Sequence, residues 1–591
     1  MILALGMLAA LHFRRGEDAK AQAFHERLLA LLDRCVERGT PDPMSWLRVC
    51  TLAYSCAGRK AEARQILERW MALKEKTLGP DHPELDEVLS DWDFCLDWNR
   101  DRAEMERLAR RRLSIAEKAS GPDHPDVAHR LISVAMHIPE TGRSDEGLRL
   151  FERALAIREK ALGPDHLDVA DVLDRLARAH YERKKVAKGD ECFQRALAIW
   201  DKRLSAGDFK ALEALEFVAH LYGHEHDAQA EICYRRSIAF REGHCGFDDP
   251  RLAKGLHGLA SALARQRKFP EAEALHTRAL GIRRKAFGGE HEDVAASLRE
   301  AASFFDARGR HAKAEALYRQ SIGVAEKILG PDCEELAFPL SSLANACEKQ
   351  GKISEAETFH RRALAISEKR DFGRNREDPG FLLLYRDGLA RNLEVQGRLG
   401  EAEALACQSL EIREKAYGRE NFRFAQGLGR LAANLERQKR WDEVEALLRQ
   451  SLAIWEKDLG SGSPAHVFIE NHLAYARVRQ AQGRAADAEA FFVRALKATE
   501  VSWPETGILA RVLLDFAGFL SLLGRFAEAE PLLQRALAIR GKELGPDHPD
   551  VADVLERLAE VHGMAGETAR RDEAVARVKA IRAALAAEFR A

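Results

Sequence analysis

The sequence predicts an all-α protein made of repeated helix pairs, and three observations support this prediction. Glycines that end long segments recur along the 591 residues with a commonest step of 42. Apolar residues within each segment follow the 3.6-residue period of a helix, as Val551, Leu555 and Leu558 do. Leu, Ala, Glu and Arg dominate the composition and Pro is scarce, which favours long helices. We therefore expect about fourteen antiparallel helix pairs laid end to end in one α-solenoid.

The repeated glycines divide the chain into its units. They are Gly79, Gly121, Gly163, Gly207, Gly246, Gly288, Gly330, Gly373, Gly418, Gly460 and Gly545, with Gly39 at an earlier junction and a degenerate junction near Trp503 and Pro504. We expect a helix pair over residues 1–39, tandem 42-residue units over 40–545, and a last unit with a C-terminal capping helix over 546–591. No separate domain interrupts this series, so residues 1–591 are predicted to form a single solenoid.

Alanines recur where the two helices of a unit must pack closely. One set lies seven residues before the turn that joins the helices, and two sets lie in the second helix. Because a larger side chain at these places would push the helix axes apart, we expect all three sets to be buried. They are Ala302, Ala344, Ala390, Ala517 and Ala559; Ala272, Ala314, Ala356, Ala402 and Ala529; and Ala279, Ala363 and Ala536.

Two segments show this pattern most completely: KAEALYRQSIGVAEKILGPD (Lys313–Asp332) and the stretch from Ala529 to Ala559. They resemble the tetratricopeptide repeat, and more closely its 42-residue form in kinesin light chains and in many bacterial proteins. The resemblance extends over essentially the whole chain. It implies a right-handed superhelical solenoid in which the first helix of each pair lies on the concave surface and the second on the convex surface.

A nearly identical motif follows several of the glycines and places an Asp beside a His. The copies are LGPDHPDVADVL at Leu544–Leu555 and similar stretches that begin at Leu78, Ser120 and Leu162. Metal ligands must converge, whereas one copy per unit spreads these groups along the solenoid. We expect helix punctuation instead: Gly79 ends a helix and Pro80 prevents its continuation. Asp81 should then cap the next helix and form a capping box with Glu84.

The densest group of His and Cys side chains also lacks the spacing of a metal site. It comprises His220, His224, His226, Cys233, His244 and Cys245. His220 and His224 could share a helical face, but no known zinc-ligand spacing is present. The sequence also lacks a phosphate-binding glycine loop and a G-x-S-x-G nucleophile motif. We therefore expect no metal, no cofactor and no catalytic residue, and hence no enzyme.

Charge and hydropathy argue against two classes of partner. Lys and Arg (92) nearly balance Asp and Glu (94), whereas nucleic-acid binders usually show a basic excess. No apolar run approaches the roughly 20 residues that a membrane span needs. The ten cysteines form no C-x-x-C pair, which fits a reducing cytoplasm. Residues 1–13 are apolar nearly all round, which leaves self-association through the N-terminal end open.

Polar residues on the inner side of the first helices are the remaining functional candidates. The position after the first-helix alanine should face the groove, and so should the position one turn earlier. In the family, Asn and basic residues at such places hold extended peptides, because Asn bonds both N–H and C=O while Arg pairs with carboxylates. The candidates are Arg178, His220, Ser261, Ser303, Asn345 and Arg391, with Arg299 and Asp387 one turn earlier and Asn392 and Asn434 beside the first set.

These observations predict a cytoplasmic, non-enzymatic scaffold that binds an extended peptide or a protein partner in its concave groove. The alternative is a regulatory or sensor module that controls an effector on another chain, for example a caspase-like protease or a nucleotide-binding switch. Neither kind of effector domain is visible in the sequence.

Overall fold

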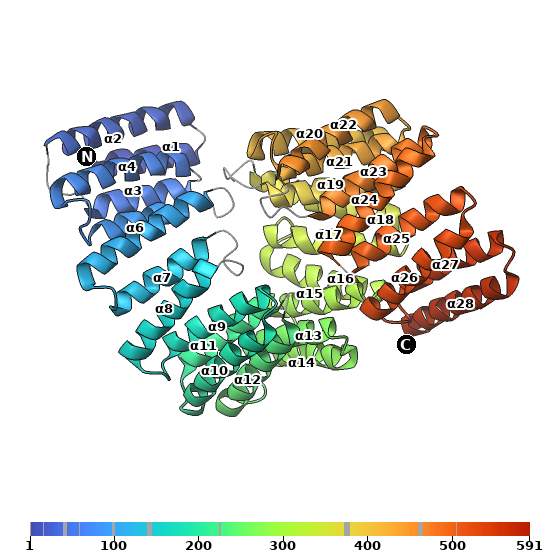
Figure 1. The fold of residues 1–591 in the computed structure, drawn as a ribbon, viewed down its shortest axis with the longest axis horizontal. Helices are drawn as coiled ribbons and strands as arrows, with labels where there is room; N and C mark the ends of the chain where they lie inside the picture. The colour runs from blue at the N-terminus through green and yellow to red at the C-terminus, as the bar shows by residue number, and fades with distance from the viewer. Residues whose placement is uncertain are drawn as a thin grey trace. The chain divides into compact units, whose positions relative to one another are not determined.

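The described part of the chain is built from helices. The computed structural model describes residues 2–15, 17–38, 44–57, 59–96, 101–138, 145–223, 226–371, 379–458, 465–503 and 505–590. Over these ranges the chain forms twenty-eight α-helices and one short 3-10 helix, η1 (Glu334–Leu336), and no strand (Figure 1). Most helices pack against the next helix within their part of the chain. The predicted all-α repeat fold of about fourteen helix pairs is confirmed.

The helices form two compact units, and each is described by itself. Unit 1 contains the first eleven helices. Odd-numbered helices are the first helices of the repeats, and even-numbered helices are the second. The bounds in unit 1 are α1 (Ile2–Arg14), α2 (Asp18–Arg38), α3 (Met44–Cys56), α4 (Lys60–Leu78), α5 (Leu85–Phe94), α6 (Arg102–Ser120), α7 (Pro125–His137), α8 (Asp145–Leu162), α9 (Leu167–Glu182), α10 (Val186–Ser205) and α11 (Phe209–Tyr222).

Unit 2 contains the other helices and η1. Their bounds are α12 (Asp227–Cys245), α13 (Leu252–Arg265), α14 (Phe269–Phe287), α15 (Glu292–Ala307), α16 (His311–Leu329), α17 (Ala337–Lys349), α18 (Ile353–Asp371), α19 (Gly380–Val395), α20 (Leu399–Tyr417), α21 (Phe422–Arg437), α22 (Trp441–Asp458), α23 (Ala465–Ala481), α24 (Ala485–Ser502), α25 (Gly507–Leu522), α26 (Phe526–Leu544), α27 (Pro549–Met564) and α28 (Thr568–Arg590). The expected junctions at Gly39, Gly373, Gly460 and Pro504 lie outside the described residues. One continuous solenoid over residues 1–591 stays a prediction.

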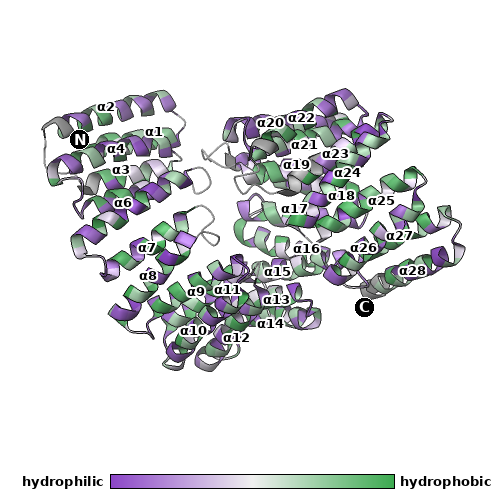
Figure 2. Cartoon of the chain, in the orientation of Figure 1, coloured by the Kyte–Doolittle hydropathy of each residue, from purple (hydrophilic) through white to green (hydrophobic). Residues whose placement is uncertain are grey.

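The core lies between consecutive helices and depends on the predicted alanines. All three alanine sets are buried. Larger side chains fill the spaces that these alanines leave, and Trp70, Trp200 and Phe492 are almost completely buried. Hydrophobic and hydrophilic stretches alternate around the helices in Figure 2, as expected where one face of each helix packs against its neighbours.

The junctions between repeats differ from the prediction in one respect, because the His and not the Asp caps the following helix. At His124, His166 and His548 the backbone is extended, and the ring Nδ1 accepts a hydrogen bond from the backbone N–H two residues later, at 3.3, 3.1 and 3.2 Å. The expectation that Asp81 and its equivalents act as caps is therefore wrong. The N-cap is the position whose side chain satisfies the free N–H groups of the first turn. Asp123, Asp165 and Asp547 lie one residue before it, and Asp81 lies three residues before the N-cap Glu84.

The Asp instead links neighbouring repeats through a Lys in the next second helix. These ion pairs have a spacing of 37 residues, and Arg–Glu pairs between successive second helices have a spacing of 36. Examples are Lys118–Asp81 at 2.6 Å, Lys369–Asp332 at 2.7 Å, Arg153–Glu117 at 2.7 Å and Arg278–Glu242 at 2.6 Å. These pairs lie at the surface, partly or largely exposed, and each adds little stability alone. Their recurrence at successive junctions favours one register between repeats.

Candidate functional site

The predicted groove residues lie on successive first helices. Arg178 and His220 lie on α9 and α11 of unit 1, and we name Ser261, Ser303, Asn345 and Arg391, on α13, α15, α17 and α19, the unit 2 stripe. His220, Ser303 and Arg391 are exposed, and the other three are half-buried. Neighbouring first helices contact each other along α13, α15, α17 and α19. The structure therefore places the unit 2 stripe on four adjacent helices.

Arg178 is held by an internal partner. Its guanidinium Nη2 lies 3.0 Å from the Asp174 carboxylate one helical turn earlier. Asp174 is buried, and this burial raises the pKa of its carboxyl group, while the positive charge of Arg178 acts in the opposite direction. The pair fixes the direction of the Arg178 side chain, which keeps part of its surface open to solvent.

The position one turn earlier is more buried than predicted. Asp174, His257 and Ser341 at this position are buried, and Arg299 is half-buried with Glu300 3.8 Å away. Asp387 is bound by the Arg413 guanidinium at 2.7 Å. This position mainly supports packing and internal ion pairs.

Asn392 and Asn434 are completely buried, and their amides bind groups of their own and neighbouring repeats. Asn392 Nδ2 donates to Glu348 at 2.7 Å and to the Ile353 carbonyl at 3.2 Å. Asn434 Nδ2 donates to Glu394 at 3.2 Å and to the Leu399 carbonyl at 3.3 Å. A partner could reach neither side chain in this arrangement, so the proposal below does not use them.

Three residues that the sequence analysis missed complete a stripe in unit 1. Leu52, Phe94 and Met136 lie on α3, α5 and α7 and are exposed, although they are large and apolar. Each lies a multiple of 42 residues before Arg178 and therefore occupies the same position in its own repeat. Counting back from Arg178 in steps of 42 would have found all three. Leu52, Phe94, Met136, Arg178 and His220 are named the unit 1 stripe.

Polar and aromatic contacts join the first helices that carry the unit 1 stripe. Arg48 of α3 lies 3.5 Å from Asp91 of α5, and His137 of α7 lies 3.8 Å from Asp93 of α5. The guanidinium of Arg175 on α9 lies 2.8 Å from the sulfur of Met136 on α7. On α9 and α11, Tyr181 and Tyr222 pack edge to face with ring centroids 6.3 Å apart. These contacts place the five helices side by side.

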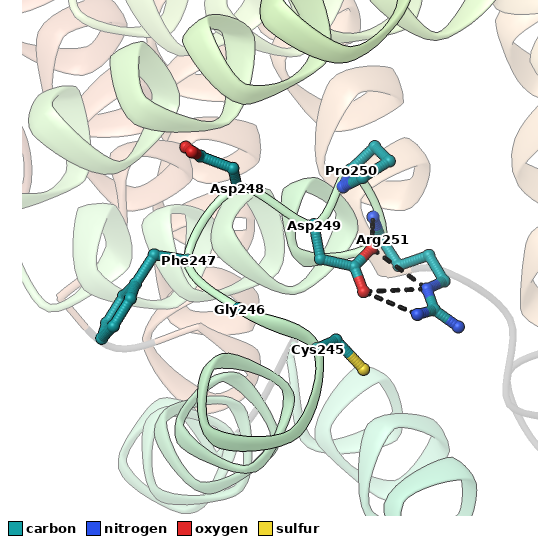
Figure 3. Close-up of a pocket in the computed structure, with 7 residues that line it drawn as sticks. All are labelled: Cys245, Gly246, Phe247, Asp248, Asp249, Pro250 and Arg251. Atoms are coloured by element: carbon teal, nitrogen blue, oxygen red, sulfur yellow. Dashed lines mark hydrogen bonds and ion pairs between the residues drawn. The ribbon is translucent and has the colours of Figure 1, made fainter.

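A shallow hollow lies at the junction between α12 and α13 (Figure 3). Its lining residues run consecutively from Cys245 to Arg251. Asp249 accepts the backbone N–H of Arg251 at 2.9 Å and pairs with its guanidinium at 2.7 Å, and these contacts lower the pKa of Asp249 to about 2. Asp249 thus replaces the capping His of other repeats. We interpret the hollow as the surface of one helix junction.

Two groups of described residues hold three potential metal ligands within 4.8 Å. They are Glu315, Cys347 and Glu355, and Glu530, His562 and Glu567. Lys352 already binds Glu315 at 2.6 Å, and burial raises the pKa of Cys347 to about 11, so the thiol stays protonated. His562 lies 2.9 Å from Glu567 in the second group. In both groups, at least one of these side chains already makes an internal polar contact.

Among the described residues, the His and Cys group noted in the sequence contributes to no set of three converging metal ligands. Cys233 is buried in α12, whereas His244 stacks on Phe240 with ring centroids 4.0 Å apart. His220 belongs to unit 1, and His224 lies outside the described residues.

None of the described helices combines the length and hydropathy that a bilayer span requires. The N-terminal helix α1 exposes Met7, Leu8 and Leu11, and self-association through it stays a prediction.

Several solved structures resemble parts of this chain at low TM-scores. Solved structures similar to this chain include a Podosopora anserina putative kinesin light chain with nearly identical TPR-like repeats, at 26% identity over 36% of this chain and 97% of that chain, with a TM-score of 0.33. BtubC (BKLC) from P. vanneervenii is 19% identical over 47% of this chain and 92% of that chain, with a TM-score of 0.27. A Rap protein complexed with competence and sporulation factor is 15% identical over 64% of this chain and 99% of that chain, with a TM-score of 0.39. At these TM-scores the three likenesses carry no functional argument.

Family models settle the assignment. No curated protein matches the sequence. One tetratricopeptide repeat model matches residues 132–188, 251–327, 300–369, 423–500 and 508–570, and a second matches residues 51–84 and 382–422. The first of these models alone covers more than half of the chain. The chain therefore belongs to the tetratricopeptide repeat family.

Proposed function

We propose that the chain is a non-enzymatic protein-interaction scaffold that binds an extended segment of a partner protein along its first helices. The unit 1 stripe carries this proposal, because its large apolar side chains are exposed at one repeated position. Family membership supports the same conclusion, since tetratricopeptide repeats typically act as protein-interaction scaffolds. Exposed apolar side chains that lie in a row are typical of protein-binding surfaces.

The chemistry of the unit 1 stripe changes along its length. Leu52, Phe94 and Met136 offer apolar contacts, and Met adapts its shape to different partners. Arg178 and His220 then offer polar contacts at the same repeat position. Adjacent packed helices lie about 8–10 Å apart, and an extended chain advances roughly 3.4 Å per residue. A bound segment should therefore place a side chain on successive helices about every third residue, with apolar side chains first and an acidic or polar one near Arg178.

The unit 2 stripe is polar throughout and suits a different kind of segment. Ser261, Ser303 and Asn345 can bind backbone N–H and C=O groups, whatever the side chains of the segment. Exposed Arg391 can bind a carboxylate. We propose that this stripe holds the backbone of a segment, whereas the unit 1 stripe selects its side chains. The alternative role, regulation of an effector on another chain, uses the same binding step.

Peptide selection tests the proposal without knowledge of the natural partner. Peptides of about 15 residues would be selected from a displayed random library against the full chain, and their Kd measured by fluorescence anisotropy. The double variant Phe94→Ala and Met136→Ala should weaken peptides bound by unit 1 about tenfold or more, because buried aromatic anchors carry most interface energy. Peptides bound by unit 2 should weaken similarly with Asn345→Ala and Arg391→Glu.

A matched control separates the stripe from exposed apolar surface in general. Phe247 is 69% exposed and Phe94 is 68% exposed, but Phe247 lies in the junction before α13 and outside both stripes. Phe247→Ala should change the Kd less than twofold. Equal losses with Phe94→Ala and Phe247→Ala, or full binding by both double variants, would show that the stripes are not the binding surface.

A further inference from the structure

The junction between α26 and α27 contacts two turns that precede it by more than 200 residues. Arg267, in the turn between α13 and α14, donates from Nη2 to the Gly541 carbonyl at 3.0 Å. Arg308, in the turn between α15 and α16, donates from Nη1 to the Leu544 carbonyl. These carbonyls belong to the C-terminal turn of α26, which carries the negative end of the helix dipole and attracts cations. In Figure 1, α26 lies beside α15 and α16 of the same unit.

The surfaces at this contact fit closely. Gly309 has a φ of +72°, and a Cβ atom on it would lie 2.6 Å from Cδ of Pro549. At this distance a side chain on residue 309 would displace α27. The Arg308 guanidinium lies 3.5 Å from the centre of the Phe269 ring, which holds Arg308 in position for Leu544. A glycine, a stacked arginine and a proline thus meet at one place.

The contact also changes the surroundings of one repeated histidine. The side chains of His124, His166 and His291 are 45%, 42% and 36% exposed, whereas that of His548 is 8% exposed. The four residues occupy the same junction position and make the same cap. His548 is buried because its Nε2 faces Gly309, at 3.4 Å from the position of the added Cβ.

We propose that these contacts form an intramolecular clasp, which closes unit 2 on itself and opens when His548 is protonated. The clasp consists of Arg267, Arg308, Gly309, His548 and Pro549. It goes beyond binding along the stripes, because it provides a way to change the shape of the scaffold. It acts directly on α13 and α15, which carry Ser261 and Ser303 of the unit 2 stripe.

The charges around His548 favour the neutral ring in the closed state. Burial lowers its pKa below the ordinary value of 6.5, and Arg308 and His311 act in the same direction. Asp550 and a hydrogen bond to the Ala307 backbone raise it, but Asp550 also lies 3.5 Å from Arg540. His311 faces Asp306 at 2.7 Å. Since the open state has the higher pKa, the clasp should be fully stable above pH 6.5 and weaken progressively as the pH falls below it.

Hydrogen exchange can show whether the clasp exists. Gly309→Val places a side chain against Pro549, whereas Gly351→Val strains the equivalent turn, with a φ of +78° and no atom within 4 Å of its added Cβ. The amides of residues 541–552 should exchange about tenfold faster in Gly309→Val than in Gly351→Val. Arg308→Gln is a milder second variant, because the equivalent position in the turn of Gly351 already holds a glutamine, Gln350. This variant should also accelerate exchange of residues 541–552. Unchanged exchange in Arg308→Gln, or equal exchange in the two glycine variants, would overturn the clasp.

The titration can be tested without loss of the helix cap. Asn421 occupies the same junction position and caps α21 through Oδ1 at 2.8 Å, so His548→Asn should keep the cap and remove the ionisable ring. Between pH 7.5 and pH 5, exchange of residues 541–552, corrected for the intrinsic rate, should accelerate several-fold in the wild type and in His166→Asn. It should stay constant in His548→Asn. The same acceleration in His548→Asn would overturn the role of His548, and a constant wild-type rate would overturn opening by acid.

Discussion

Two junctions with nearly the same sequence differ in their surroundings. The junction at Gly163–Asp168 reads GPDHLD and is exposed, whereas that at Gly545–Asp550 reads GPDHPD and lies against the α15–α16 turn. Both end one helix and cap the next in the same way. The difference teaches that the motif encodes the local turn and no more. The second junction has its additional contact because Arg308 and Gly309 lie opposite it.

The largest expected effect should be the same at both junctions, because each junction is supported by a buried leucine two helical turns after its His. Leu173 follows His166 by seven residues and Leu555 follows His548 by seven, and both are buried. Leu173→Ala and Leu555→Ala should each reduce local stability by about 2–5 kcal/mol through lost burial and a cavity. Hydrogen exchange of α9 and α27 measures this, since repeat arrays need not unfold in one step. A much smaller effect at Leu173 would mean that the helix cores behind the two junctions are not equivalent.

Removal of the capping His ring should cost more free energy at the Gly545–Asp550 junction than at the Gly163–Asp168 junction. His166→Ala loses the cap bond to the Asp168 N–H, which should cost about 1 kcal/mol, as for other N-caps. His548→Ala loses the same bond and also leaves a space at the contact with Gly309, so its cost should be larger by about 1 kcal/mol or more. Exchange rates of the first turns of α9 and α27 give both values at pH 7.5. Equal costs would contradict the tighter contact at His548.

The smallest effect should come from the ion pairs that link repeats. Asp165 pairs with Lys202 and Glu505 pairs with Lys542, each 37 residues apart and each largely exposed. Asp165→Asn and Glu505→Gln should each change exchange in the adjacent second helix less than twofold, because exposed pairs gain little and salt screens them. A large effect at Glu505 alone would imply that its pair supports the clasp.

The fold could be predicted from the sequence because repetition makes a weak local signal visible many times. Ala302 and Ala314 are predicted and found in the core for a local reason, the close approach of two helices of one pair. The sequence predicts Asp81 as the cap, because Asp is a common N-cap residue and His is not. The backbone angles at the junction decide which residue is the N-cap, and the sequence does not reveal them.

The site was less predictable, because exposure depends on neighbouring repeats. Asn392 is polar and close to the expected groove, but Glu348 of the previous repeat binds its amide in the interior. Phe94 looks like a core residue until the helix directions are known, and the structure exposes it. The contact of Arg308 with Leu544 spans 236 residues, and no local pattern indicates it.

The clasp makes the number of repeats between its two halves a fixed quantity. In most of a tandem array, one unit can be gained or lost by recombination, because each repeat contacts only its neighbours. An extra 42-residue unit between Gly309 and Gly545 would move the α26–α27 junction away from Arg308. Selection on the clasp would then act on length rather than on residue type, and this stretch of the chain would be expected to keep its repeat number while other stretches vary.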